Sequence, residues 1–158
     1  PRIMRGIGEI LSEPLRLPAL PAVLVNPGVP VPTGAVFGAL ARSREGVAPP
    51  AIDTDPAARL AEAEAPPQFD ALLDALRASG NDLEPPALAL FPAVGETLAA
   101  LRRIATCRLA RMSGSGGTCF GLFASTDDAR DAAAELRRDH PGWWVQATIL
   151  GTGSAPAQ

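Results

Sequence analysis

Two short apolar runs joined by a glycine-rich segment set the strongest limit on the fold of this chain. Residues 107–112 and 119–124 are apolar enough to form strands, and the six residues between them, Ser113–Thr118, contain three glycines and three hydroxyl side chains. A connection this short cannot hold a crossover, so the two strands are expected to pair as an antiparallel hairpin. The second run is apolar on both faces, which is typical of a central strand.

The remaining patterns predict helices and two more strands. The apolar run Ala22–Val25 lies between Pro21 and the turn residues Asn26-Pro27-Gly28, and partial alternation over 143–150 predicts a last strand. Apolar spacing, capping residues and prolines predict helices over residues 33–41, 57–65, 69–79, 83–90, 92–104 and 125–140. This order predicts an α+β fold, a two-layer ferredoxin-like sandwich whose antiparallel sheet has helices on one face.

Four features of these helices have simple structural interpretations. Thr33 is expected at the N-cap of its helix, and Phe37, one turn later, on the apolar face that packs into the core. Asn81-Asp82 is expected to cap the helix over 83–90. His140 is expected near a helix C-terminus, where its cationic form is favoured.

The composition excludes several kinds of chemistry. All 14 basic residues are Arg, so the chain has no lysine for a Walker A motif or a Schiff base. With one histidine and two cysteines, no zinc site built from several histidines or cysteines is expected. The net charge of −3 gives no reason to expect nucleic acid, and no apolar run approaches the roughly 18 residues needed to span a bilayer. Cys107 and Cys119 are expected as core thiols in a cytoplasmic protein.

The glycine-rich segment Ser113–Thr118 is the strongest candidate for a binding site. Consecutive backbone amides in such a loop can form a nest for an anion, and glycines allow a ligand to approach closely. A plain hairpin turn between two strands would have the same sequence, so both interpretations stand on the residues alone.

Four motifs, in order, give this chain a family resemblance. They are Arg5–Leu11, Asn26–Thr33, Asn81–Glu84 and Arg111–Phe123. Together they resemble the C-terminal half of a cytidyl-substrate kinase of the GHMP kinase superfamily, over about residues 3 to 150. The glycine loop alone would indicate only the superfamily.

The resemblance implies an ATP-dependent phosphorylation of a hydroxyl on a cytidine-diphospho sugar alcohol, in the non-mevalonate route to isoprenoid precursors. In such enzymes the cleft lies between two domains, and the main phosphate loop, the catalytic Asp and its partner Lys belong to the N-terminal domain. No catalytic or metal-binding residue is therefore expected in this chain. ATP with Mg²⁺ is expected to be bound mainly by that domain, and the isolated chain to be inactive.

The same resemblance assigns roles to particular residues. A phosphate-loop support is expected from Ser113, Gly114, Ser115, Gly116, Gly117 and Thr118. Ile7, Thr33 and Phe37 are expected to line the substrate pocket, although Gly34 stands where relatives often have proline.

The resemblance also predicts the domain organisation and the partners. Residues 1–14 are expected to end an N-terminal domain or to link to it, residues 15–150 to form the C-terminal domain, and residues 151–158 to be a disordered tail. The expected partners are the sugar alcohol substrate, ATP and the N-terminal domain of the same enzyme, with no nucleic acid and no membrane.

Two alternatives remain open from the sequence. The chain could be a stand-alone ferredoxin-like module that binds or senses a ligand without catalysis. It could also belong to another GHMP small-molecule kinase, such as a homoserine or mevalonate kinase. The Gly6–Glu9 and Pro27–Thr33 segments favour the cytidyl-substrate enzyme by resemblance.

Overall fold

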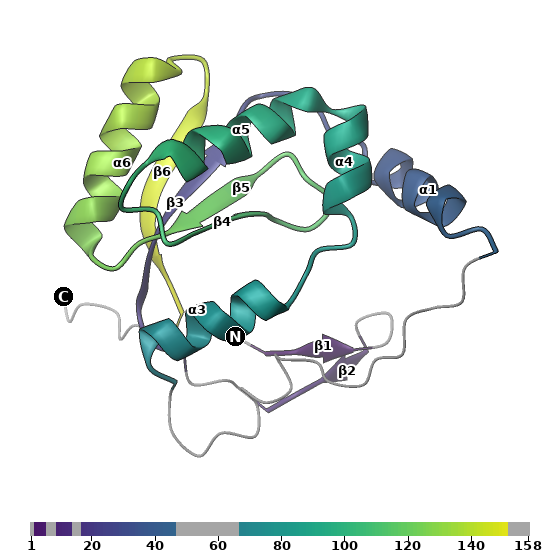
Figure 1. The fold of residues 1–158 in the computed structure, drawn as a ribbon, viewed down its shortest axis with the longest axis horizontal. Coiled ribbons are helices and arrows are strands. Elements are labelled where there is room, and N and C mark those ends of the chain that lie inside the picture. The colour runs from purple at the N-terminus through teal and green to yellow at the C-terminus, as the bar shows by residue number, and fades with distance from the viewer. Residues whose placement is uncertain (1, 6–8, 14–16, 47–66, 152–158) are drawn as a thin grey trace. The chain divides into compact units, whose positions relative to one another are not determined.

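The structure of the chain is a computed structural model (Figure 1). The structure describes residues 2–5, 9–13, 17–46 and 67–151. The chain divides into two compact units. The larger unit comprises residues 21–50 and 81–148, and the smaller one comprises residues 1–20, 51–80 and 149–158. The predicted helix over 57–65 and nearly all of the predicted tail lie outside the described residues.

A four-stranded sheet forms the larger unit's centre, with the strand order β4-β5-β3-β6. Its strands are β3 (Leu20–Asn26), β4 (Leu109–Met112), β5 (Cys119–Leu122) and β6 (Trp144–Leu150). Strand β5 is antiparallel to both its neighbours, since Cys119 pairs with Met112 on one side and with Val25 on the other. The predicted hairpin and the central position of its second strand are therefore confirmed.

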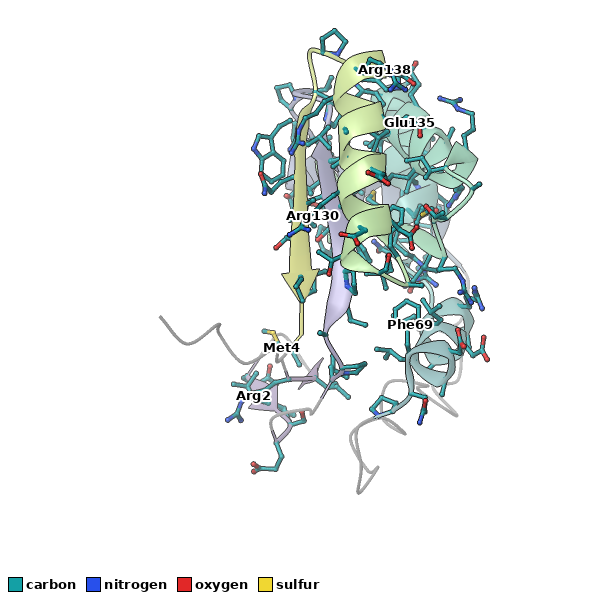
Figure 2. The ribbon with its side chains drawn as sticks, turned by 90° about the vertical axis from the view of Figure 1, so that its left-hand side faces the viewer. Arg2, Met4, Phe69, Arg130, Glu135 and Arg138 are labelled. Atoms are coloured by element: carbon teal, nitrogen blue, oxygen red, sulfur yellow. The ribbon has the colours of Figure 1, made fainter. Side chains whose placement is uncertain are left out.

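Four helices belong to the same unit. They are α1 (Thr33–Ser43), α4 (Glu84–Leu90), α5 (Pro92–Arg103) and α6 (Thr126–Asp139). Seen from the side, α5 and α6 lie over the same face of the sheet (Figure 2). Pro92 ends α4 and begins α5, because proline lacks the N–H that a helix interior needs but fits its first turn. The arrangement confirms the predicted α+β fold with helices on one face.

One buried apolar cluster holds α5, α6 and the sheet together. On α5, Val94, Leu98 and Leu101 repeat at helical spacing and are at most 1% exposed. The buried face of α6 consists mostly of alanines, which let the helix approach the sheet closely. The sheet adds the buried side chains of Val23, Val25, Ala110, Met112, Cys119 and Val145. The predicted apolar faces of these two helices are thus confirmed.

Helix α6 begins with a side-chain cap. Ser125, the first residue of the helix predicted over 125–140, is its N-cap, and its hydroxyl accepts a hydrogen bond from Asp128 N at 3.0 Å. Asp127 and Asp128 lie in the first turn and Arg137 and Arg138 in the last, which complements the helix dipole. His140 is the C-cap, as expected, and its ring stacks on Trp143 with 3.8 Å between centroids.

Ser125→Ala is expected to lower the free energy of unfolding by about 1 kcal/mol, because the Asp128 amide loses its acceptor. Urea denaturation followed by circular dichroism measures this change. Ser43→Ala is the control, since the Ser43 hydroxyl donates only to Leu40 O in the preceding turn of α1. Its effect should stay below about 0.5 kcal/mol. Equal losses in both variants would contradict the capping role.

The smaller unit contains one short hairpin and one helix among its described residues. Strands β1 (Met4–Arg5) and β2 (Ile10–Leu11) pair antiparallel, with Met4 opposite Leu11. Helix α3 (Phe69–Ala78) agrees with the predicted helix over 69–79 and buries Leu72 and Leu73. None of the helices in the described ranges is long and apolar enough to cross a membrane.

Two expectations about α1 are wrong. Pro32, not Thr33, is the N-cap, and no side chain caps the helix. Pro32 takes the cap position because its carbonyl oxygen accepts the first bonds of the helix, from Ala35 N at 3.0 Å and Val36 N at 3.4 Å. Phe37 is 52% exposed and is no core residue, whereas its neighbour Val36 is fully buried. Successive helical residues point about 100° apart, so the side that buries Val36 turns Phe37 outward.

Candidate functional site

The glycine loop, Ser113–Thr118, makes a tight turn between β4 and β5. Ser113 N donates to Thr118 O at 2.9 Å, and Gly116 N donates to Ser113 O at 3.1 Å. Gly114, Gly116 and Gly117 have φ angles of 55°, 113° and 82°, in the region that side chains other than glycine rarely adopt. The backbone path of the loop therefore depends on its three glycines.

Gly116 also lies where a side chain has no room. A Cβ atom there would lie 3.2 Å from Val31 Cγ1, 3.3 Å from Met112 Sδ and 3.8 Å from Val94 Cγ2. Val94 and Met112 belong to the core, and Val31 belongs to the proline-rich segment before α1. The middle of the loop is thus packed directly on the hydrophobic cluster.

The outer part of the loop has backbone donors to offer. Among the hydrogen bonds of the described residues, none uses the backbone amides of Gly114, Ser115 or Gly117. Neighbouring amides left without acceptors in a glycine-rich turn suit the oxygens of an anion such as phosphate. The geometry is therefore compatible with phosphate binding, because the turn has backbone N–H donors that a ligand could use.

Two residues contact this loop, one at the end of β3 and one at the start of α1. The hydroxyls of Thr33 and Ser115 share a hydrogen bond of 2.9 Å, and Asn26 Nδ2 donates to Thr118 Oγ1 at 3.2 Å. Asn26 Oδ1 also accepts from Gly28 N at 2.8 Å, which holds the turn after β3. The structure thus brings the predicted substrate residue Thr33 to the predicted phosphate loop.

The other two predicted substrate residues, Phe37 and Ile7, have no described contact with the loop. Phe37 lies one turn after Thr33 on α1, and its ring is largely exposed. Ile7 lies outside the described residues. Of the three predicted substrate residues, only Thr33 has a described contact with the loop.

Asn81 also contacts the loop, which the sequence patterns did not predict. Its Nδ2 donates to Gly114 O at 2.9 Å and to Met112 O at 3.3 Å, and its Oδ1 accepts from Leu83 N at 3.1 Å. The expected helix cap is misplaced, since the N-cap of α4 is Leu83. Asn81 instead forms a turn before the helix and reaches residues more than 30 positions later.

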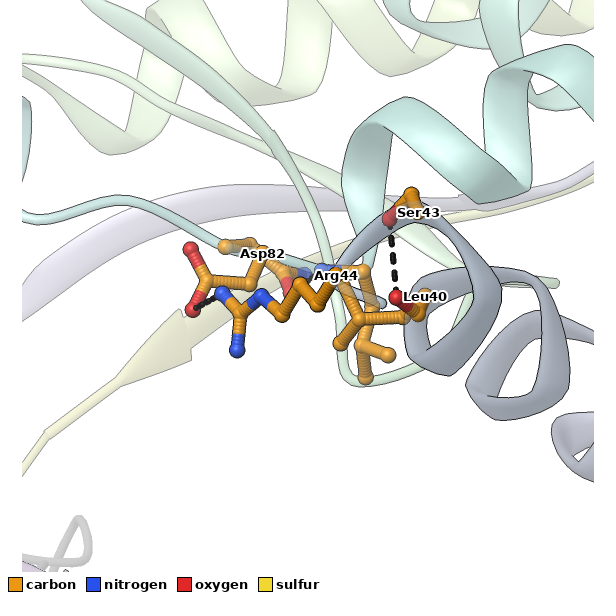
Figure 3. A network of polar contacts seen from close by, with 6 residues as sticks. Leu40, Ser43, Arg44 and Asp82 are labelled. Carbon is orange, nitrogen blue, oxygen red and sulfur yellow. Dashed lines mark hydrogen bonds and ion pairs between the residues drawn. The ribbon is translucent and has the colours of Figure 1, made fainter. Parts of the chain in front are cut away.

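An exposed ion pair lies beside Asn81. Arg44 Nη2, just after α1, lies 2.6 Å from Asp82 Oδ2 (Figure 3). The two side chains are 43% and 67% exposed, so the pair contributes little to stability, at most about 1 kcal/mol. It does connect the end of α1 to the residue next to Asn81.

The two cysteines are unsuited to nucleophilic chemistry. Burial raises the pKa of the Cys119 thiol to about 12, and it also raises the pKa of Cys107. A thiol that stays protonated at neutral pH is a poor nucleophile. Cys119 is fully buried and confirmed as a core thiol, while Cys107 is half-buried just before β4.

The sheet order, the helices on one face and the glycine loop define a class of kinase domain. The family described as "GHMP kinases C terminal" matches residues 57–142, which is more than half of the chain, and the chain belongs to this family. The 4-diphosphocytidyl-2-C-methyl-D-erythritol kinase of Methylobacterium radiotolerans is 52% identical to it over 150 residues, or 94% of this chain and 49% of the relative. The chain thus spans about half the length of the curated relatives it matches.

Solved structures agree with this assignment. A crystal structure of 4-(cytidine 5'-diphospho)-2C-methyl-D-erythritol kinase superposes with a TM-score of 0.66 at 37% identity, over 96% of this chain and 50% of that one. L. major mevalonate kinase, solved with R-mevalonate, has a TM-score of 0.68 over 98% of this chain and 49% of its own. At 17% identity, the second likeness shows a shared fold only.

Proposed function

We propose that this chain is the C-terminal part of an ATP-dependent kinase that phosphorylates the hydroxyl of 4-diphosphocytidyl-2-C-methyl-D-erythritol. The reaction would belong to the non-mevalonate route to isoprenoid precursors. The high identity to relatives of that name, over nearly the whole chain, supports this substrate over mevalonate or homoserine. The single structural observation that carries the proposal is the Thr33–Ser115 hydrogen bond, because it joins the substrate segment to the glycine loop.

The glycine loop would serve the phosphate end of the reaction. Phosphoryl transfer depends mainly on positioning and on stabilising the charge of the phosphate oxygens. The amides of Gly114, Ser115 and Gly117 are the donors that this chain offers for that purpose. Bound MgATP would supply the transferred phosphoryl group and the metal's charge. We assign the base and the main phosphate loop to the N-terminal half of the enzyme.

We assign no Mg²⁺ ligand to this chain. Within the ranges the structure describes, no group of three or more His, Cys, Asp or Glu side chains could hold a metal ion. The polar side chains at the loop are hydroxyls and amides, namely Ser113, Ser115, Thr118, Thr33, Asn26 and Asn81. Such neutral groups suit phosphate oxygens better than a divalent cation, which prefers carboxylates.

The substrate end would be lined by Thr33 and Phe37, while Ile7, assigned to it by resemblance, lies outside the described residues. An exposed aromatic ring on α1 offers a flat apolar surface against which a base can stack. The further partner would be the N-terminal domain of the same enzyme, and we expect neither nucleic acid nor membrane as a partner. Both cysteines are free thiols, which suits the reducing cytoplasm that we propose as the location.

A chimeric enzyme tests the proposed function. The matching half of the Methylobacterium radiotolerans kinase is replaced by this chain, and transfer of phosphate from ATP to the sugar alcohol is measured. We expect the chimera to be active and this chain alone to be inactive. A folded but inactive chimera, together with saturable micromolar ligand binding by this chain alone, would instead indicate a stand-alone binding module.

Phe37→Ala in the chimera is expected to raise the KM for the sugar alcohol about tenfold, with little change in kcat, because a stacking surface is lost from ground state and transition state alike. Since the ring is largely exposed, the free energy of unfolding should change by less than about 0.5 kcal/mol. Steady-state kinetics and thermal unfolding give both quantities.

Val36→Ala is the matched control on the same helix. Val36 is fully buried, so its truncation should lower stability by about 2 kcal/mol and leave KM unchanged. If Phe37→Ala lowers the melting temperature and leaves KM at the wild-type value, Phe37 has no part in substrate binding.

A further inference from the structure

We propose that Asn81 is the positioning residue of the glycine loop: its side-chain amide sets the direction of the Ser115 backbone N–H, which donates to a phosphate oxygen of the nucleotide. The inference rests on the proposed function, which assigns this loop to phosphate. The inference gives Asn81 a role in this loop, because a role in helix capping does not explain its two hydrogen bonds to Met112 O and Gly114 O.

The side chain of Asn81 links two elements that are far apart in the sequence. Its oxygen accepts from Leu83 N at 3.1 Å, at the start of α4. Its nitrogen donates to Met112 O at 3.3 Å and to Gly114 O at 2.9 Å, on the first limb of the loop. A side-chain amide has two N–H donors, so these two carbonyls account for both.

The bond to Gly114 O determines where the next amide points. In a trans peptide the C=O and the N–H point in opposite directions, and the described part of the chain has no cis peptide bond. With the Gly114 carbonyl turned toward Asn81, the Ser115 N–H must point away from Asn81. No hydrogen bond within the described residues uses this N–H, so it remains available to a ligand.

The conformational freedom of Gly114 is the reason why a restraint from Asn81 matters. Gly114 has φ 55° and nothing within 4 Å of the position of a Cβ, so its own surroundings place little restraint on the peptide that follows. Backbone freedom at glycine is larger than at any other residue. The hydrogen bond from Asn81 to Gly114 O therefore restrains the peptide between Gly114 and Ser115, which has no other restraint from the surroundings of Gly114.

Asn81 is itself held on both sides. Its backbone carbonyl oxygen accepts from Glu84 N at 2.9 Å. The exposed ion pair between Asp82, the next residue, and Arg44 adds little to this anchoring (Figure 3). Glu84 Oε1 lies 3.4 Å from Arg102 Nη2, which connects the turn to α5. A side chain anchored in this way can hold the loop in one orientation before the nucleotide arrives.

Asn81→Asp separates the two roles of this residue. The carboxylate keeps an acceptor for Leu83 N but loses both donors and faces the carbonyls of Met112 and Gly114. In the chimeric kinase we expect kcat to fall about thirtyfold, because a misdirected donor no longer stabilises the transferred charge. The KM for the sugar alcohol should change less than about twofold.

Asp82→Asn is the matched control, because it makes the reverse exchange at the next residue. It weakens the pair with Arg44 and leaves the contacts of the loop in place, so kcat should stay within about twofold of the wild-type value. If Asn81→Asp does not fold, Asn81→Ser replaces it, since serine keeps an acceptor and its single, shorter O–H cannot replace both N–H donors.

A spectroscopic readout tests the direction of the amide itself. In the chimera labelled with ¹⁵N-serine, the Ser115 amide signal should shift when a non-hydrolysable ATP analogue with Mg²⁺ is added, and this shift should be lost in Asn81→Asp. Loss of melting temperature with an unchanged kcat, or a Ser115 signal that ignores the nucleotide, would overturn the positioning role. If the unsubstituted chimera is inactive, the proposed function itself fails.

Discussion

Gly116→Val is expected to lower kcat of the chimeric kinase at least about a hundredfold, the size of effect seen when a preorganised donor is lost. The φ of 113° is essentially closed to valine, and its Cβ would lie 3.2 Å from Val31 Cγ1 and 3.3 Å from Met112 Sδ. The loop must therefore move away from the core, and its amides move with it. Steady-state kinetics with saturating ATP and sugar alcohol measures the loss.

The stability of this variant should fall much less than its turnover. The loop joins two strands at the edge of the core, so a local shift can relieve most of the strain, and we expect a loss of about 1–3 kcal/mol. Gly121→Ala is the control, because a Cβ there would lie 3.0 Å from Leu101 Cδ2 inside the core. That variant should lose about 1–3 kcal/mol and keep its kcat. A wild-type rate for Gly116→Val would mean that the loop is only a turn.

Phe123→Ala is expected to lower the free energy of unfolding by about 3–5 kcal/mol, the largest effect on stability predicted for this chain. Phe123 is fully buried directly after β5, and its backbone N donates to Pro21 O at 2.9 Å. Removing the ring leaves a cavity within the core cluster that alanine cannot fill. A domain of this size is stable by about 5–15 kcal/mol, so the midpoint of urea denaturation should fall markedly.

Phe120→Ala makes the same change three residues earlier. Phe120 is only half-buried on β5, so its truncation should lower the free energy of unfolding by about 1–2 kcal/mol. Both variants should keep the wild-type kcat at temperatures where they are folded. Equal losses of stability at the two positions would contradict the assignment of Phe123 to the core.

Most helices and strands could be predicted because their signals are local. The spacing of Val94, Leu98 and Leu101 predicts the buried face of α5, and the structure buries all three. A hydroxyl residue at position 125 or 126 predicts the cap of α6, and the Ser125 hydroxyl accepts from Asp128 N. Such patterns extend over one or two turns, where backbone hydrogen bonding and side-chain direction decide the conformation.

The errors concern residues whose role depends on distant neighbours. Thr33 is a residue type that is common at N-caps, but its hydroxyl forms a hydrogen bond with Ser115, 82 residues later. Phe37 fits the apolar face predicted for this helix, yet Val36 beside it is the residue that is buried in the core. Asn81 fits a cap, and its donors bind carbonyls 31 and 33 residues later. No periodicity in the sequence reports which of these partners the fold brings near.

The sequence by itself determined the α+β class, the antiparallel hairpin and the need for glycine in its turn, because these follow from chain connectivity, apolar period and the φ angles that side chains allow. Only the tertiary structure decided that Thr33 and Asn81 both contact the glycine loop. These contacts depend on how β3, β4 and β5 align and on how α1 and α4 pack, which no short segment encodes. Contacts between such distant residues form only when the whole core is assembled.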